Sequence, residues 1–493
     1  MKKESIKKLV FVVLLILVSL FSNGKFTLFF AIWISTAMLL YAARRFSTIL
    51  GFLFSWLFLT LIFIFQFYEI VLLPLPFHIL TMTVTALISA LPILIDLLFS
   101  KNRKNFLHTL IFPTSAVIIG YLYYKYHPYG TWGHLAYTQH SQLILLQSVS
   151  IFGLGYITFI ISWFASVINW TYHQNFNWNI IKKGAVIFSL VLGLTMAYGS
   201  FRILFQNPQS DTIRIASISA LPEMGIYDND LWGLNLEGGK EIFKKQTTKL
   251  NNNLFNRSIK EAKAGAKIVF WAEGNSLILK EDELKFYEYA SQVAENNKIF
   301  LGIAAGIIDP KNDKPLENKF IFFNPKGEKV IDYWKAIPVP GFESNMSNIK
   351  DSKIQKTKTS YGIISAVICF DMDFPDHLKT ANGVDILLVP SNDWKAIDPI
   401  HTQMASFRAL EQGFNMIRQT SKGLSSGFDY MGRSISEMDH FTDENKVLIT
   451  QLPTKGTNTI YSIIGDTFIV FCLLLLILVI IILKKKKSGK VNS

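Results

Sequence analysis

Residues 362–375 read GIISAVICFDMDFP, an apolar run that ends at Cys369 and is followed by acidic residues and Pro375. A short continuous apolar run bounded by turn signals is typical of a strand buried on both faces. Comparable runs lie along the chain at 267–275 (KIVFWAEGN), 298–304 (KIFLGIA), 319–324 (KFIFFN) and 385–392 (DILLVPSN). Helical stretches separate these runs, so the sequence predicts an α/β layered fold around a largely buried sheet. No glycine-rich phosphate loop opens any of the helices, which disfavours a nucleotide-binding domain.

The segments flanking this region have the composition of a membrane protein. The 493-residue chain is 50% hydrophobic and 17% charged, with a mean hydropathy of +0.30. Apolar stretches long enough to cross a bilayer, about 20 residues each, occur near 8–22, 26–43, 49–73, 77–99, 107–124, 143–170, 184–205 and 460–483. We therefore expect about eight transmembrane helices. The predicted domains are a seven-helix membrane domain at 1–205, a soluble domain at 206–459, and a last helix with a basic tail at 460–493.

The basic residues indicate the orientation in the membrane. With the N-terminus in the cytoplasm, alternation places on the inner side Lys2, Lys3, Lys7, Lys8, Arg44, Arg45, Lys101, Arg103, Lys104, Lys182, Lys183, Lys484 to Lys487 and Lys490. The outer loops before the soluble domain then carry only Lys25 and Lys125, as the positive-inside bias requires. The soluble domain holds 30 of the 49 basic and 32 of the 36 acidic residues, so the net charge of +13 arises at the membrane flanks. Nucleic-acid binding is therefore a poor explanation of that charge.

Two groups of polar residues near the spans could indicate an ion pathway or a metal site. Glu69 and Asp96 lie in or close to apolar stretches, where carboxylates often mark ion pathways, yet each is near a span end from which it could reach the headgroups. His127, His134 and His140 occur in an aromatic loop without regular ligand spacing. We favour an interfacial aromatic belt over a metal site for this loop, and predict neither a metal nor a cofactor.

Three reactive residues each stand where a predicted strand ends. Glu273 ends the run KIVFWAE, Lys335 follows VIDYW, and Cys369 ends ISAVIC. Each alone has an ordinary structural explanation, as a cap, a solvated lysine or an inert buried thiol. Together they supply what nucleophilic catalysis requires: a thiol, a base to deprotonate it, and a cation for the developing oxyanion.

The motifs around these residues match a known superfamily. The order WAEGN (271–275), YWK (333–335), ICFDMDFP (368–375), PSND (390–393) and FRALEQG (407–413) resembles the nitrilase or carbon–nitrogen hydrolase superfamily. Seven spans before such a domain and one after it resemble the apolipoprotein N-acyltransferases of bacterial envelopes, over essentially the whole chain. The resemblance implies an αββα sandwich, a Glu273–Lys335–Cys369 triad, and a catalytic domain outside the cytoplasmic membrane with both termini inside.

The resemblance also implies supporting residues. Glu343 keeps the family's spacing of eight residues after the lysine, although the loop reads PGFE instead of the usual FGE. Phe370 and Asp371 follow the cysteine where the family commonly has Tyr and Glu. Trp232 and Trp394 are candidate substrate contacts, or equally interface anchors.

Other members of the motif helix are expected to be structural. His401, Gln403 and Arg408 fall on the helix that buttresses the family's site, and we expect Arg408 to support the structure together with Glu411.

The implied activity is transfer of a fatty acyl chain from a membrane phospholipid, through a Cys369 thioester, to the N-terminal amino group of a diacylglyceryl-modified apolipoprotein. The alternative is a membrane-bound amidase or nitrilase in which water discharges the thioester, since the triad is common to both. A non-enzymatic lipid-binding domain is disfavoured because all three reactive side chains are retained. A transporter is disfavoured by the scarcity of intramembrane charge.

Overall fold

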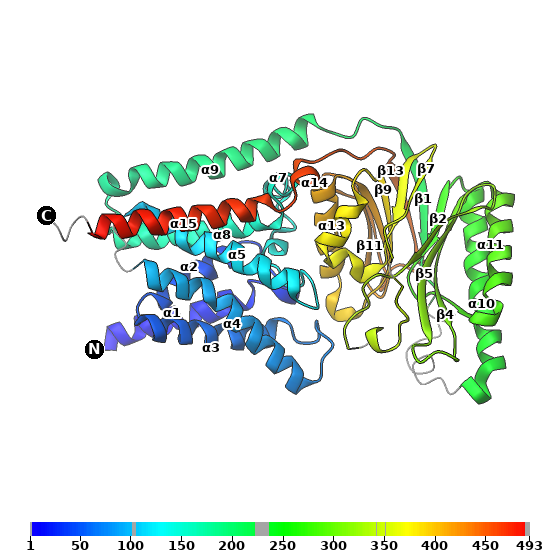
Figure 1. The fold of residues 1–493 in the computed structure, drawn as a ribbon, viewed down its shortest axis with the longest axis horizontal. Coiled ribbons are helices and arrows are strands. Elements are labelled where there is room, and N and C mark those ends of the chain that lie inside the picture. Colours follow the sequence, from blue (N-terminus) through cyan, green and yellow to red (C-terminus); the bar gives the residue numbers. More distant parts are fainter. Residues whose placement is uncertain (1, 101–104, 222–235, 342, 351, 489–493) are drawn as a thin grey trace. The chain divides into compact units, whose positions relative to one another are not determined.

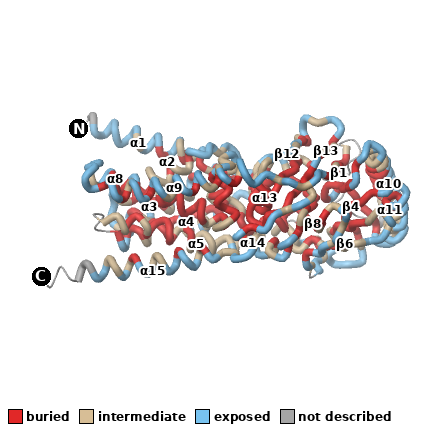
Figure 2. The backbone as a smooth tube through the Cα atoms, turned by 90° about the horizontal axis from the view of Figure 1, so that it is seen from above, coloured by how far each residue is buried: buried red, intermediate tan, exposed pale blue. Residues whose placement is uncertain are grey.

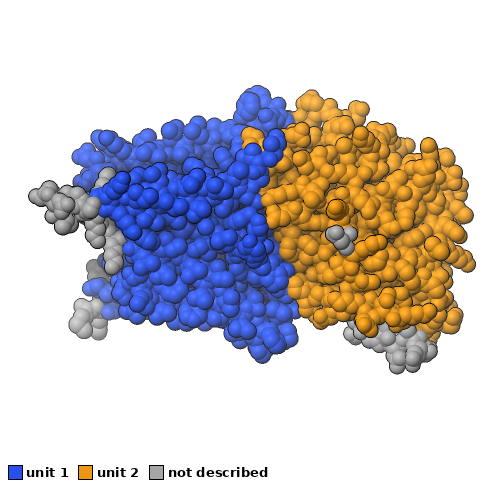
Figure 3. All heavy atoms as spheres, in the orientation of Figure 1, with its two compact units in different colours: residues 1–206, 463–493 blue, residues 207–462 orange. Residues whose placement is uncertain are grey.

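The computed structural model describes the chain except residues 1, 101–104, 222–235, 342, 351 and 489–493. The chain divides into two compact units, residues 1–206 with 463–493 and residues 207–462 (Figure 3). Each unit has its own buried core, one made of helices and the other of two sheets with helices (Figure 1).

The first unit is helical, as its long apolar runs dictate. Its helices are α1 (Lys2–Leu20), α2 (Ala31–Ala43), α3 (Thr48–Gln66), α4 (Leu75–Phe99), α5 (Ile111–Tyr126), α6 (Leu143–Leu146), α7 (Val149–Phe152), α8 (Leu154–His173), α9 (Trp178–Phe205) and α15 (Thr467–Ser488). Within the described ranges, six helices are long and apolar enough to cross a membrane: 48–66, 75–99, 106–126, 154–173, 178–205 and 467–485. The predicted runs at 8–22 and 26–43 fall on α1 and on the 13-residue α2. The total of eight spans remains a prediction.

One predicted span is interrupted. The apolar run at 143–170 forms α6, α7 and α8 instead of a single helix. Gly153 separates α7 from α8 with a φ of 68°, in the half of backbone space that glycine adopts without a steric penalty. Helix α8, which follows Gly153, is the most buried of the six long apolar helices. The break at Gly153 therefore sets the direction in which α8 begins.

The surroundings of Asp96 differ from those that the sequence predicted. Instead of reaching headgroups, its side chain is fully buried and accepts two hydrogen bonds from Arg44, Nε to Oδ2 at 2.9 Å and Nη2 to Oδ1 at 2.8 Å. Ser100 Oγ donates to the same carboxylate at 3.0 Å. A paired, hydrogen-bonded charge of this kind holds α2 and α4 together. The Arg44–Asp96 pair is therefore a structural element of the helical unit.

The second unit contains two sheets. The seven-stranded sheet has the order β13 (Val447–Pro453), β1 (Thr212–Ile218), β2 (Ile268–Trp271), β4 (Phe300–Ile308), β5 (Leu316–Phe323), β6 (Lys329–Trp334), with β3 (Ser276–Leu279) also paired to β4. The six-stranded sheet has the order β12 (Ser434–Asp439), β11 (Leu424–Phe428), β10 (Asn415–Ser421), β9 (Ile386–Asn392), β8 (Gly362–Ala366), β7 (Lys356–Thr359). The pairs β1–β2, β2–β4, β8–β9 and β9–β10 are parallel.

Helices cover the outer face of each sheet, so the unit is the expected αββα sandwich (Figure 1). Helices α10 (Leu236–Lys263) and α11 (Glu283–Asn297) pack on the first sheet and α13 (Ile400–Gln412) on the second. The short α12 (Pro375–Leu378) contacts α13, and α14 (Ile460–Ile464) begins within the last residues of this unit. One apolar core fills the space between the sheets and another lies beneath α10 and α11. Figure 2 shows this burial as red strands with pale blue outer turns on α10 and α11. Strands β2 and β8, each parallel to a neighbour in its own sheet, therefore run along this apolar core.

Candidate active site

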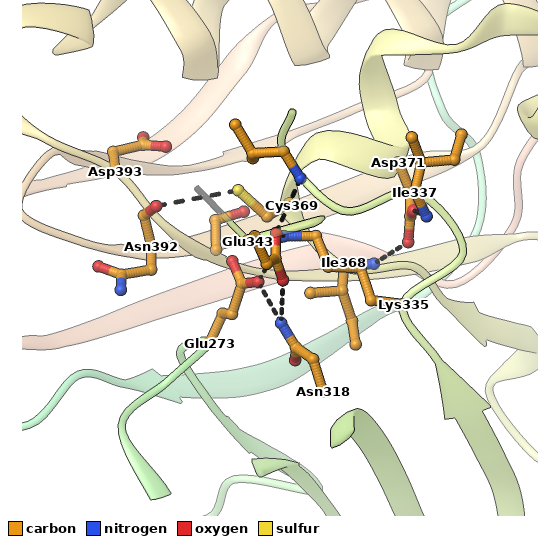
Figure 4. A network of polar contacts seen from close by, with 12 residues as sticks. Glu273, Asn318, Lys335, Ile337, Glu343, Ile368, Cys369, Asp371, Asn392 and Asp393 are labelled. Carbon is orange, nitrogen blue, oxygen red and sulfur yellow. Dashed lines mark hydrogen bonds and ion pairs between the residues drawn. The ribbon is translucent and has the colours of Figure 1, made fainter. Parts of the chain in front are cut away.

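The three reactive residues come from three different strand ends. Glu273 follows β2, Lys335 follows β6 directly, and Cys369 begins the 3-10 turn Cys369–Asp373 a few residues after β8. Because β2 and β6 belong to one sheet and β8 to the other, only the packing of the two sheets brings these residues together (Figure 4).

A buried lysine forms the centre of the site. Lys335 Nζ lies 2.8 Å from Glu273 Oε1 and 2.5 Å from Glu343 Oε2, and all three side chains are buried. Asn318 Nδ2 donates to Glu273 Oε1 at 2.7 Å and to Glu343 Oε1 at 2.9 Å. Although burial lowers the pKa of Lys335, the two carboxylates outweigh it and hold that pKa well above its usual value. Lys335 is therefore a permanent cation, fixed by two acids that Asn318 holds in place.

The thiol of Cys369 faces this charged group. Its sulfur lies 3.9 Å from the carbonyl oxygen of Asn392, and the residue is 4% exposed with a φ of 47° (Figure 4). A positive φ is uncommon for a residue other than glycine and is found at turns that aim a functional side chain. Burial and the charge of Glu273 raise the pKa of the thiol, whereas Lys335 lowers it. Cys369 thus rests as a thiol, with both a proton acceptor and a cation close by.

Asp371 ties the cysteine turn to the lysine loop. Its Oδ2 accepts from Tyr333 OH at 2.7 Å and from the backbone N–H of Ile368 at 3.0 Å, and its Oδ1 accepts from the N–H of Ile337 at 2.9 Å. Burial raises the pKa of Asp371 to about 7, against the lowering effect of the hydrogen bond from Tyr333. Phe370 is buried beside it and packs edge-on against Phe374.

A second set of charges lies on the other side of the thiol. Asp393 is paired bidentately with Arg418, Nη1 to Oδ2 at 2.8 Å and Nη2 to Oδ1 at 2.9 Å. His401 lies between two acids, with Nδ1 2.8 Å from Asp393 Oδ1 and Nε2 3.0 Å from Asp373 Oδ2. Burial alone would raise the pKa of Asp393, but Arg418 and His401 outweigh it and hold that pKa far below its usual value.

The spacing of this second set invites comparison with a metal site. Among the described residues, one group has metal-ligand spacing, and ligand atoms of Cys369, Asp393 and His401 lie within 4.8 Å of one another. However, both carboxylate oxygens of Asp393 already accept hydrogen bonds from Arg418, and His401 already contacts Asp373. A cation placed there would have to displace or repel a buried guanidinium. The residues therefore fit an ion-pair network better than a metal centre.

The remaining predicted site residues vary in placement. Trp232 lies outside the described residues. Trp394 is half-buried and precedes the 3-10 turn Lys395–Ile397, and nothing in its surroundings tests a substrate contact. Arg408 Nη1 lies 2.7 Å from Glu411 Oε2 on α13, both fully or almost fully buried, which agrees with a structural role.

Sequence reasoning did not single out Asn318, Asp393 or Arg418. Asn318 lies between Glu317 and Lys319 in the polar first half of β5 (LENKFIFF), so no local pattern marked it as a functional contact. Asp393 lies in the motif PSND that was quoted for the superfamily, but its partner Arg418 is 25 residues further on, and no local pattern connects them.

Comparison with known proteins bears on both units. Residues 14–167 match the family model described as the apolipoprotein N-acyltransferase N-terminal domain, and residues 244–461 match the carbon-nitrogen hydrolase model. An apolipoprotein N-acyltransferase from Borreliella burgdorferi is 25% identical over 386 residues, covering 71% of this chain and 69% of the relative. Apolipoprotein N-acyltransferase 1 of Treponema denticola is 24% identical over 477 residues, covering 83% of each chain. The two family models and these relatives together support the apolipoprotein N-acyltransferase family, within the nitrilase superfamily, for this chain.

Among solved structures, an amidase from Nesterenkonia sp. is 15% identical, with a TM-score of 0.38 over 50% of this chain and 92% of that one. The carbon-nitrogen hydrolase match, residues 244–461, includes Glu273, Lys335, Glu343 and Cys369. The thiol and the three charged side chains near it thus all lie within the region that the superfamily model recognises.

Proposed function

We propose that this protein is an apolipoprotein N-acyltransferase that moves a fatty acyl chain from a membrane phospholipid to the α-amino group of an N-terminal diacylglyceryl-cysteine. The observation that carries the proposal is a buried thiol beside the Glu273–Lys335–Glu343 group, in a chain of which both units match models connected with this family. The catalytic residues are Glu273, Lys335 and Cys369.

The first half-reaction forms a thioester. Glu273 accepts the proton of the Cys369 thiol, and the thiolate attacks the ester carbonyl carbon of the phospholipid. Lys335, with the backbone N–H of Phe370, stabilises the oxyanion of the tetrahedral intermediate. The bond to the glycerol oxygen then breaks, that oxygen takes the proton from Glu273, and a lysophospholipid leaves the acyl-enzyme.

The second half-reaction transfers the acyl chain. The amino group of the diacylglyceryl-cysteine attacks the thioester carbonyl while Glu273 accepts one of its protons. The carbon–sulfur bond breaks, the amide forms, and the Cys369 sulfur regains a proton from Glu273. Because Lys335 remains charged throughout, the same cation serves both oxyanions.

The membrane-spanning helices support this assignment because both proposed substrates reside in the bilayer. The donor is a phospholipid and the acceptor carries a diacylglyceryl group, so lateral diffusion can bring each to an enzyme in the same membrane. The basic residues at the predicted inner loops support a cytoplasmic-membrane location with both termini inside and the catalytic domain, residues 206–459, outside.

The test is the intact mass of the detergent-purified full chain after incubation with phospholipid. The native protein should gain one acyl mass and Cys369→Ala should gain none. A diacylglyceryl-cysteine peptide should discharge the adduct, whereas water should not on the same timescale. Absence of any adduct on the native protein would contradict the proposal. Rapid release of free fatty acid without peptide would assign the site to a membrane-bound hydrolase.

A further inference from the structure

Four buried charged residues form a cluster next to the nucleophile that the mechanism above does not use. This cluster consists of Asp373, Asp393, His401 and Arg418, each at most 5% exposed. Polar atoms of Asp393 and His401 lie within 4.8 Å of each other and of the Cys369 sulfur. The cluster is therefore close enough to act on the thiol directly, through its charge.

The cluster joins the two backbone segments that surround the thiol. Asp373 ends the 3-10 turn that begins at Cys369, and Asp393 follows Asn392, whose carbonyl oxygen lies 3.9 Å from the sulfur (Figure 4). His401, on α13, contacts both acids, with Nε2 3.0 Å from Asp373 and Nδ1 2.8 Å from Asp393. One imidazole ring thus connects the nucleophile's turn to the end of β9.

The cluster is electrically neutral only when His401 is protonated. The groups facing the ring are the acids Asp373 and Asp393, the guanidinium of Arg418, whose Nη2 lies 2.8 Å from Nδ1, and the thiol of Cys369. Two carboxylates and one guanidinium leave one negative charge, which an imidazolium cancels. Further out, the carboxyl of Asp398 interacts with Asp393 and Arg418.

The surroundings favour the protonated ring. Burial lowers the pKa of His401 and so does Arg418, but Asp373 and Asp393 outweigh both and the pKa is raised. A neutral ring would leave an uncompensated negative charge within reach of the sulfur. Such a charge opposes ionisation of the thiol, in the same direction as the effect of Asp393 itself.

We infer that His401 is a positioning residue for Cys369: as an imidazolium it holds the nucleophile's turn against the end of β9 and cancels the charge of the buried acids beside the thiol. This inference rests on the proposed role of Cys369 as the nucleophile. His401 touches neither substrate in the mechanism, so its effect acts through the reactivity of the sulfur. Loss of the imidazolium should make the thiolate harder to form without removing the base Glu273.

The experiment measures the rate at which iodoacetamide alkylates Cys369 between pH 6 and pH 10, by peptide mass spectrometry on the full chain in detergent. His401→Gln keeps a hydrogen-bonding side chain but no charge. It should slow alkylation by about tenfold at every pH of this range, because a rise of one unit in the pKa of the thiol reduces the thiolate fraction tenfold. His440→Gln is the matched control, because burial and Lys446 lower the pKa of His440 to about 4 and its replacement removes no charge.

A double variant separates charge from structure. Asp373→Asn/His401→Gln removes one negative and one positive charge and should restore most of the native alkylation rate. A native profile in His401→Gln, or a double variant no faster than the single one, would overturn the inference. If the single variant does not fold, a folded double variant with near-native alkylation supports the inference and an unfolded one overturns it.

Alkylation needs no lipid substrate, so this result is independent of the acyl-adduct test. A native protein that forms no acyl adduct yet shows the expected alkylation pattern would remove the proposed function and leave the effect of His401 on the thiol intact. An acyl adduct on the native protein, together with an unchanged alkylation profile in His401→Gln, would overturn only the role of His401.

Discussion

Asp371 accepts a hydrogen bond from the backbone N–H of Ile337 at 2.9 Å, across the space between the cysteine turn and the lysine loop. The same buried carboxylate accepts hydrogen bonds from Tyr333, the penultimate residue of β6, and from the backbone of Ile368, just before the turn that begins at Cys369. The separation of the thiol from the ammonium group is therefore set by this contact as well as by the packing of the two sheets.

A pH dependence of stability follows from the same carboxyl. Burial raises the pKa of Asp371 to about 7, so between its unfolded pKa, near 4, and about 7 the folded protein binds a proton that the unfolded chain has lost. Stability should therefore fall as pH rises through this window, by up to about 1.4 kcal/mol per pH unit. The measurement is the thermal midpoint of the native protein minus that of Asp371→Asn, from pH 5 to pH 8. A difference that does not change with pH would show that Asp371 keeps one charge state throughout.

Asn318 should matter more than an ordinary strand residue. Its amide donates to both Glu273 and Glu343, so Asn318→Asp removes two donors and adds a third carboxylate. We expect the single-turnover rate of acyl-enzyme formation to fall by about a hundredfold. Asn324→Asp, in the exposed turn after the same strand, makes the same chemical change away from the site and should leave the rate unaltered. Equal rates for the two variants would contradict the role of Asn318.

The two acids on Lys335 should differ in their effects. Glu273→Gln removes the proposed base and should reduce acylation by about a thousandfold. Glu343→Gln leaves Lys335 paired with Glu273, so the loss should be about tenfold. Single-turnover acylation rates of the two variants, measured side by side with the native protein, distinguish them. Similar losses for both would mean that the base has been misassigned.

The helical unit offers an independent prediction. Arg44→Leu removes the cation from the buried carboxylate of Asp96 and leaves the hydrogen bond from Ser100, and it should lower the free energy of unfolding by about 3–5 kcal/mol. The double variant Arg44→Leu/Asp96→Leu removes both charges and should regain most of that stability. Thermal unfolding in detergent compares the stabilities of these variants, with Arg45→Leu, a substitution of the neighbouring exposed arginine, as the control. A double variant no more stable than the single one would argue against the pairing.

The sequence alone determined the fold class of both units and the three strand ends at Glu273, Lys335 and Cys369. Those features are local: buried strands need short apolar runs, membrane helices need long ones, and a reactive residue after a strand occupies adjacent positions in the chain. The motifs around them were specific enough to indicate the family, which the comparisons with known proteins then supported. The Arg408–Glu411 contact was also predictable, because residues three apart on a helix are neighbours.

Only the tertiary structure decided which distant groups meet. Asn318 reaches Glu273 because β5 and β2 flank β4 in one sheet, and Asp393 pairs with Arg418 because β9 and β10 are parallel neighbours. The pairing of Asp96 likewise depends on Arg44, at the end of α2, reaching α4 rather than on the distance of Asp96 from a span end. Strand order and helix packing depend on the whole chain, so the electrostatic surroundings of Cys369 could not be obtained from local sequence patterns.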